Sequence, residues 1–163
     1  MLTLRFTAAI GVGAMVSALA VAPALCAPSQ PMPSTAMMIP IRALVRFVNT
    51  GISAPSGTYA RGAVITDEFA PFVWTTADAG TRWSTGFAAY NASSKITKPH
   101  IVLAVPTEFN VSATRAYIVF PAAFTPLLNG KPFTETGYWT FVLVKDGAVW
   151  RVASQTWAGV TFK

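Results

Sequence analysis

The stretch from Thr136 to Gly159, TGYWTFVLVKDGAVWRVASQTWAG, decides the fold of this chain. Two long apolar runs flank Lys145-Asp146-Gly147, and an Asp-Gly pair favours the positive φ angles of a tight hairpin turn. Both runs are rich in Trp, Tyr, Phe, Val and Thr, which suit a pleated and largely buried surface. The sequence therefore predicts a protein built around an antiparallel sheet.

Further strands are expected upstream of this hairpin. From His100 onward the chain shows only strand patterns, and Asn129-Gly130 supplies a turn between the second and third strands. The expected strands are His100–Val105, Ala113–Phe124, Lys131–Lys145 and Ala148–Gly159. Together they predict a four-stranded antiparallel meander with apolar residues on both faces.

The segment before His100 predicts two helices and one strand. Apolar residues recur with helical spacing after Pro40, and Gly51 is expected to end this helix. Ala63–Trp74 is rich in β-branched and aromatic residues and predicts an edge strand that bends at Pro71. Asp78–Asn91 predicts the second helix. One face of it carries Trp83, Phe87 and Tyr90.

The N-terminal residues 1–26 have the pattern of an export signal. Arg5 precedes an apolar run, Phe6–Leu25, and small residues follow it. We expect cleavage after Cys26, which makes the mature protein periplasmic or secreted. Lipidation of Cys26 is not expected, because Leu25 stands where lipoprotein signals carry a small residue. An uncleaved membrane anchor is the alternative, since the run approaches the ~20 apolar residues of a spanning helix.

The mature chain is expected to form one domain. A Pro-, Ser- and Gln-rich leader is predicted at 27–36 and the domain at 37–160. Removal of the signal leaves eleven basic and six acidic residues, a formal charge of about +5, and no cysteine. No disulfide is then possible, but a chain of ~135 residues can bury a sufficient core without one. The basic residues form no run, so nucleic acid is not an expected partner.

Composition also limits the chemistry. His100 is the only histidine, so a two-histidine zinc site cannot form, and no metal is expected. The glycine-rich fingerprints of nucleotide and dinucleotide sites are absent from the sequence. We therefore expect no cofactor. His100 follows Lys98-Pro99 at the start of a strand, where a surface position is the simpler interpretation.

Several stretches resemble the nuclear transport factor 2-like superfamily, and within it an exported SnoaL-like subgroup. These are ITDEFAPFVW, the helix with Arg82-Trp83, RAYIVFPAAFT, KPFTETGYWTFVLVKDG and WRVASQTWAG, and the resemblance runs from about Met37 to Gly159. It implies an α+β fold in which a cone-shaped, curved antiparallel sheet wraps around N-terminal helices. It also implies an apolar pocket at the open end of the cone, a place where many relatives hold small hydrophobic ligands.

The resemblance suggests where a catalytic carboxylate would lie. In the ketosteroid isomerase pattern a general base lies on the first strand, where this chain has Asp67 and Glu68, and Glu68 matches the register better. Only one of two successive residues can face the cavity in a regular strand. The tyrosine and the protonated acid of that pattern are replaced by Leu44 and Trp139, and the dehydratase pattern needs two histidines. A structural hydrogen bond or ion pair is the simpler interpretation of either acid.

Three functions are compatible with these observations. The first is an exported domain that binds a small apolar or aromatic molecule. The second is a metal-independent lyase or isomerase that uses Glu68 or Asp67 as base, and the third is an interaction module with a filled cone. An apolar outer sheet face predicts a homodimer. The aromatic residues expected to bind a ligand are Trp74, Trp83, Tyr90, Tyr117, Trp139 and Trp157, two or three of which should touch the cavity.

Overall fold

The computed structural model describes residues 32–163. The predicted export signal, its cleavage site and Cys26 lie outside these residues, as does most of the predicted leader. Among the residues described, no helix is long and apolar enough to cross a bilayer.

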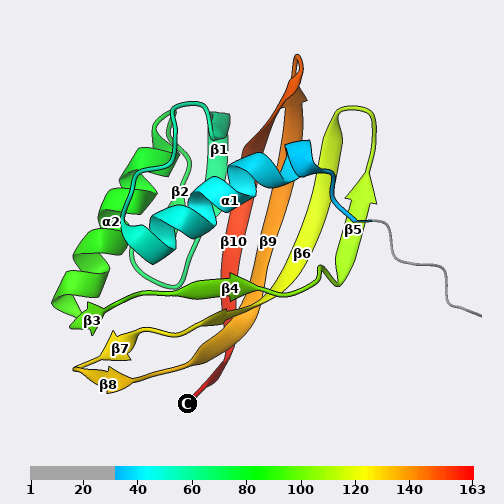
Figure 1. The fold of residues 1–163 in the computed structure, drawn as a ribbon. Coiled ribbons are helices and arrows are strands. Elements are labelled where there is room, and N and C mark those ends of the chain that lie inside the picture. The colour runs from blue at the N-terminus through cyan, green and yellow to red at the C-terminus, as the bar shows by residue number, and fades with distance from the viewer. Residues whose placement is uncertain (1–31) are drawn as a thin grey trace, which may run out of the picture. The chain divides into compact units, whose positions relative to one another are not determined.

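Two helices and a strongly curved sheet make up the domain (Figure 1). The helices are α1 (Thr35–Thr50) and α2 (Ala79–Ser93). The strands are β1 (Tyr59–Thr66), β2 (Val73–Trp74), β3 (Ile96–Thr97), β4 (Ile101–Leu103), β5 (Glu108–Val111), β6 (Arg115–Phe124), β7 (Leu127–Leu128), β8 (Lys131–Pro132), β9 (Glu135–Asp146) and β10 (Val149–Phe162). This α+β architecture confirms the predicted fold class.

Helix α1 begins earlier than predicted, inside the expected leader. The side chain of Ser34 accepts a hydrogen bond from the backbone N–H of Met37, at 3.3 Å, and so caps the helix. The helix ends as expected at Gly51, whose φ of 70° is left-handed and whose N–H donates to the carbonyl of Phe47. The apolar face of α1, including Ile41 and Leu44, is buried in the core.

The main sheet has the strand order β2-β1-β10-β9-β6-β4, and β5 also pairs with β6. Strands β6, β9 and β10 form the predicted antiparallel meander, and Gly147 at the β9–β10 turn has the expected positive φ of 60°. A small second sheet joins β3, β7 and β8, with the Asn129-Gly130 turn between the last two. The predicted strand at Lys131 is thus divided into β8 and β9.

The sheet is mixed, whereas an antiparallel sheet was predicted. β1 pairs in parallel with β10. Helix α2 and the strands β2–β9 lie between these two strands in the sequence, so no short hairpin turn forces them to be antiparallel. β1 also ends at Thr66, so the predicted strand from Ala63 to Trp74 is interrupted by a turn before β2 resumes. Asp67 and Glu68 lie in that turn.

The register between β9 and β10 shifts twice, between Val152 and Ser154 and between Gly159 and Thr161. Such β-bulges increase the twist and bend of a strand. At the second bulge Gly159 lies opposite Gly137, where a side chain on Gly137 would come within 2.1 Å of the Ala158 carbonyl oxygen. The paired glycines therefore permit the sharp curvature of this end of the sheet.

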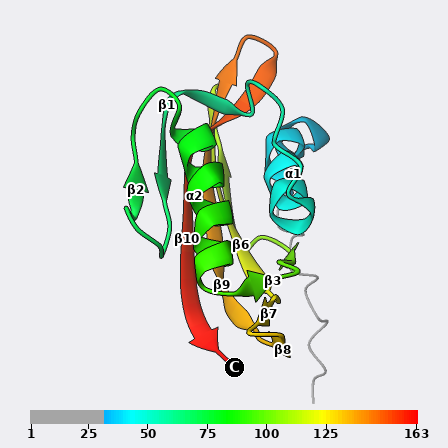
Figure 2. The same ribbon diagram turned by 90° about the vertical axis from the view of Figure 1, so that its left-hand side faces the viewer.

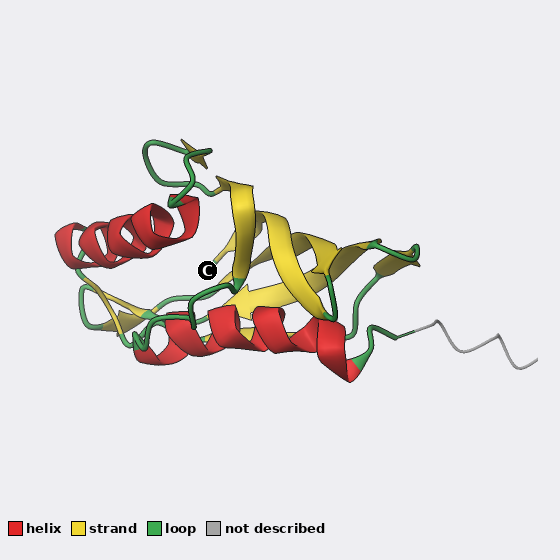
Figure 3. Ribbon diagram, turned by 90° about the horizontal axis from the view of Figure 1, so that it is seen from above, coloured by secondary structure: helices red, strands yellow, loops and turns green. Residues whose placement is uncertain are grey.

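Helix α1 crosses the face of the long strands, and α2 lies along the β1 side of the sheet (Figures 1 and 2). Seen from above, the two helices and the curved strands surround a common interior (Figure 3). The innermost side chains come from both layers; Ile41, Ile65, Ile118, Phe141 and Val152 are each 0% exposed.

Candidate functional site

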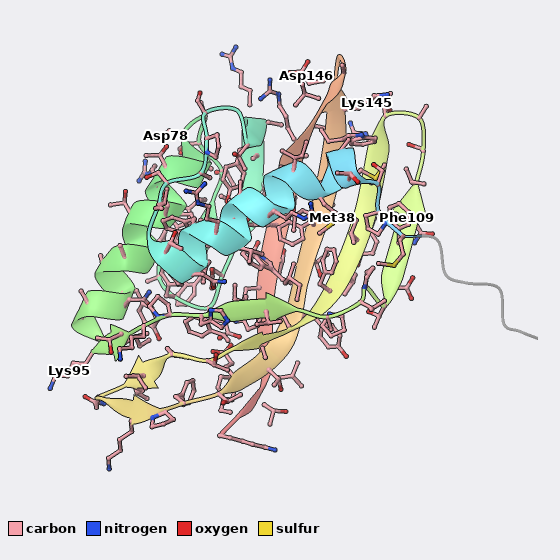
Figure 4. The ribbon with its side chains drawn as sticks, in the orientation of Figure 1. Met38, Asp78, Lys95, Phe109, Lys145 and Asp146 are labelled. Atoms are coloured by element: carbon pink, nitrogen blue, oxygen red, sulfur yellow. The ribbon has the colours of Figure 1, made fainter. Side chains whose placement is uncertain are left out.

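A cavity of about 310 Å³ lies between α2, the turn after β1 and the inner face of β9 and β10. Helix α2 forms one wall of the cavity. Asp78 and Lys95, which Figure 4 labels, flank its two ends. The face predicted from the spacing of Trp83, Phe87 and Tyr90 is the face that lines the cavity. Most of the lining is apolar, as in many small-molecule sites.

Three carboxyl groups converge on this apolar cavity: Asp67, Glu68 and Glu135. Asp67 and Glu68 both reach it, because they follow β1 rather than lie within it. The alternation rule for a regular strand therefore does not apply to them. Glu135 is the first residue of β9, far from Asp67 and Glu68 in the sequence.

Each carboxylate is held by neutral hydrogen-bond donors. The Trp83 indole Nε1–H donates to Asp67 Oδ2 at 2.8 Å, and the Glu68 backbone N–H donates to Asp67 Oδ1 at 2.8 Å. The Trp157 Nε1–H donates to Glu135 Oε1 at 2.6 Å. The backbone N–H of Gly159 donates to Glu68 Oε1. These contacts fix the orientation of all three groups.

Burial raises the pKa of two of these groups. Desolvation raises the pKa of Asp67 to about 6, against the opposing effect of its hydrogen bond from Trp83. Desolvation also raises the pKa of Glu135 to about 7, helped by the neighbouring charge of Glu68 and by a hydrogen bond between these two carboxyl groups. A hydrogen bond between two carboxyl groups requires a proton on one of them. The site therefore holds a proton near neutral pH.

Gly159 allows Glu68 and Glu135 to approach each other. A Cβ atom on Gly159 would lie 2.3 Å from Glu135 Oε1 and 2.6 Å from Glu68 Oε1, both well inside van der Waals contact. The bulge in β10 thus supplies a hydrogen-bond donor and also leaves open the space for the carboxyl pair.

Asn91 adds a polar group to the same cavity. It is 8% exposed, and its Oδ1 has no hydrogen-bond partner among the described residues. A buried acceptor without a partner is costly, with a typical penalty of about 1–3 kcal/mol. Such an atom in a cavity wall marks a position where a ligand donor would be stabilising.

Four of the six predicted aromatic residues line the cavity: Trp83, Tyr90, Trp139 and Trp157. Trp74 lies outside the lining, because its ring packs on Phe69 with centroids 5.1 Å apart. Tyr117 is also outside it and 42% exposed, since its neighbours Ala116 and Ile118 on β6 point inward and alternation turns Tyr117 outward.

The remaining candidates lie elsewhere. Leu44 is 1% exposed in the core and does not line this cavity. His100 is exposed and outside the cavity, in agreement with a surface position. In residues 32–163, no cluster of His, Cys, Asp and Glu side chains has the arrangement of a metal site.

The sequence reasoning missed Glu135 and Asn91. Glu135 lies four residues before Trp139 on β9, so strand alternation places both on the same face, and this signal was available. Asn91 lies eight residues after Trp83 on α2 and shares its helical face. Neither residue could be linked to Asp67 without knowledge of how the sheet curves.

No protein-family profile matches the sequence, and no functionally curated protein matches it. Solved structures do match its fold. The hexachlorocyclohexane dehydrochlorinase LinA-type3 from Novosphingobium barchaimii aligns with a TM-score of 0.66 at 10% identity, over 78% of this chain and 86% of that one. A nuclear transport factor 2-like superfamily protein from Salmonella enterica aligns with a TM-score of 0.61 at 16% identity, over 75% and 87%.

A third structure, the Kfla4162 protein from Kribbella flavida, aligns with a TM-score of 0.62 at 14% identity, over 78% of this chain and 90% of that one. These likenesses establish that the chain has the nuclear transport factor 2-like fold, as the sequence resemblance implied.

Proposed function

We propose that residues 37–160 form an exported domain that binds a small, largely apolar molecule in the cavity beside α2. The cavity itself carries this proposal: its walls are apolar and aromatic, and a few polar groups converge on it. This combination is typical of small-molecule sites. A cavity of about 310 Å³ also argues against an interaction module whose cone is filled by its own aromatic side chains.

Native mass spectrometry of the protein purified from its own compartment tests the proposal. We expect a mass increment from a copurifying small molecule. Leu128→Trp, which places a larger side chain at the cavity wall, should remove the increment. Thr97→Trp is the matched control, because Thr97 is exposed and lies outside the cavity lining. An increment that survives Leu128→Trp would show that the ligand binds elsewhere.

A second candidate function is a metal-independent lyase or isomerase. It is favoured by Asp67, whose raised pKa of about 6 leaves it ionised at neutral pH and a stronger base than an ordinary aspartate. Asp67 is more deeply placed than Glu68, which is exposed and whose Oε1 accepts from Gly159. The name of the similarly folded dehydrochlorinase describes an elimination, a reaction in which the substrate loses a proton.

In this second candidate, Asp67 removes a proton from a carbon of the bound substrate, and the protonated Glu135 donates one to the leaving or receiving atom. Once a copurifying molecule is identified, Asp67→Asn should abolish its turnover while changing its affinity less than about threefold. Glu108→Gln, at an exposed residue outside the cavity, is the control and should retain turnover. If Asp67→Asn leaves turnover intact, Asp67 is not the base.

We also propose that the protein forms a homodimer through the outer face of its sheet. This face carries the exposed apolar residues Val102, Tyr117, Tyr138 and Val160. The first, third and fourth of these line a shallow hollow on β4, β6, β9 and β10. Exposed apolar patches of this kind commonly mark protein contacts.

A further inference from the structure

The charge inside the cavity is opposite to that of the chain. The full sequence contains only six acidic residues against twelve basic ones, yet three of the six, Asp67, Glu68 and Glu135, line this one cavity. Among the described residues that line it there is no lysine, arginine or histidine. A basic protein therefore gathers half of its acidic residues in one cavity.

This negative charge has no counter-charge within the described part of the chain. Apart from the hydrogen bond that Glu68 and Glu135 share, the partners of the three carboxyl groups are the Trp83 and Trp157 indoles and the backbone N–H groups of Glu68 and Gly159. All four of these donors are neutral. The one salt bridge that the described residues form joins Arg151 to Asp146 at the β9–β10 hairpin. Neither residue lines the cavity. None of these contacts brings a positive charge to the three carboxyl groups.

Asn91 supplies an independent observation. Its side chain is buried and lines the same cavity, and its Oδ1 accepts no hydrogen bond from the described residues. This atom needs a donor, as do the free lone pairs of the carboxylates. An ammonium group carries several N–H donors and a positive charge, so its chemistry suits both kinds of acceptor in this cavity.

The aromatic walls favour the same ligand chemistry. The N–H edges of Trp83 and Trp157 are occupied by Asp67 and Glu135, so what these indoles offer a ligand is ring surface. Trp139 and Tyr90 add further rings to the lining. The faces of such rings attract cations, and aromatic cages are a common means of binding organic ammonium groups.

We propose that the cavity binds a small organic cation, an amine with an apolar body, whose ammonium group lies among Asp67, Glu68, Glu135 and Asn91 while its apolar part contacts the aromatic wall. This inference rests on the proposed function, because it names the ligand class of that cavity. A metal ion is the other cation that carboxylates could attract, but it would leave the apolar wall without a contact.

Isothermal titration calorimetry with a matched pair of probes tests the inference. 2-Phenylethylamine and 2-phenylethanol have nearly the same shape, and only the first is a cation. We expect the amine to bind at least about tenfold more tightly, because hydrogen bonds to charged groups are stronger than neutral ones. Glu135→Gln should remove most of this difference and leave the affinity for the alcohol unchanged. Glu108→Gln, at an exposed residue outside the cavity, is the matched control.

Proton release gives a second readout. A cation beside Glu135 and Asp67 lowers the pKa of both groups. The charge of Glu68, which faces both groups, acts in the opposite direction and raises their pKa values. With starting pKa values of about 7 and about 6, the two groups together hold about one proton near pH 6.5. Amine binding there should release up to about one proton, measured by titration in buffers of different ionisation enthalpy. The alcohol should release none.

Equal affinity for the two probes would overturn the inference while the small-molecule cavity stood. Amine binding that is insensitive to Glu135→Gln and releases no proton would place the amine elsewhere on the protein and also overturn it. Competition by magnesium chloride at matched ionic strength would identify a metal site instead. If neither probe binds, the inference and the proposed cavity function both fail.

Discussion

Glu135→Gln should stabilise the protein at alkaline pH. Glu135 is 8% exposed, and burial and the nearby Glu68 raise its pKa from 4.5 to about 7. Gln can keep the acceptor oxygen for the Trp157 N–H and can donate its amide N–H to Glu68. The variant thus reproduces the protonated form of Glu135 at every pH.

The magnitude follows from linkage between protonation and folding. Since the folded pKa lies above the unfolded one, the native state binds more protons between about pH 4.5 and 7, and the free energy of unfolding falls as pH rises through this window. Each pKa unit corresponds to 1.36 kcal/mol, so ionising Glu135 costs about 3 kcal/mol at pH 8 and nothing at pH 4. Glu135→Gln removes this cost.

Urea denaturation of the wild type and the variant at about pH 4.5 and pH 8 measures the effect. We expect nearly equal stability at the lower pH and a variant more stable by about 2–3 kcal/mol at the higher one. Glu108→Gln, at an exposed position, should change stability by less than about 0.5 kcal/mol at both. A Glu135→Gln protein that is no more stable than the wild type at pH 8 would refute the buried, proton-holding carboxyl pair.

Three further predictions concern the neighbours of this pair and the outer face. Gly159→Ala should cost about 1–3 kcal/mol, because its Cβ would overlap Glu68 and Glu135, whereas unchanged stability in urea would show that the pair is not tightly packed against β10. Trp83→Phe should raise the pKa of Asp67 further above about 6, since it removes the N–H that favours the ionised carboxylate; carboxyl NMR titration measures this, and a lower pKa would contradict it. Tyr138→Lys should shift sedimentation from dimer to monomer by placing a charge on the outer sheet face, and a wild-type protein that stays monomeric at every concentration would contradict the homodimer.

The sequence was most informative where local pattern determines structure. The Gly51 helix end, the Gly147 turn, the face of α2 and the meander strands follow from spacing and turn chemistry, and all are present. The predicted start of α1 near Pro40 is too late, because Ser34 caps the helix and Pro40 lies inside it. A proline six residues into a helix is tolerated here.

The candidate site depended on features that no local pattern contains. Asp67 and Glu68 were placed in one continuous strand, whereas the chain turns after Thr66 and directs both side chains to the cavity. Glu135 approaches Glu68 only because β10 bulges near Gly159. The three carboxyl groups come together because the sheet is curved. Glu135 is far from Asp67 and Glu68 in the sequence, so no local pattern predicts that they meet.

The carboxyl ¹³C chemical shifts of Asp67 and Glu135, followed from about pH 3 to pH 9, test most directly whether the cavity gathers buried carboxyl groups. The structure predicts midpoints of about 6 for Asp67 and about 7 for Glu135, with the Glu135 titration altered when Glu68 is replaced by Gln. Midpoints near 3.8 and 4.5, the values of exposed groups, would show that both side chains face water and that no acidic cavity exists.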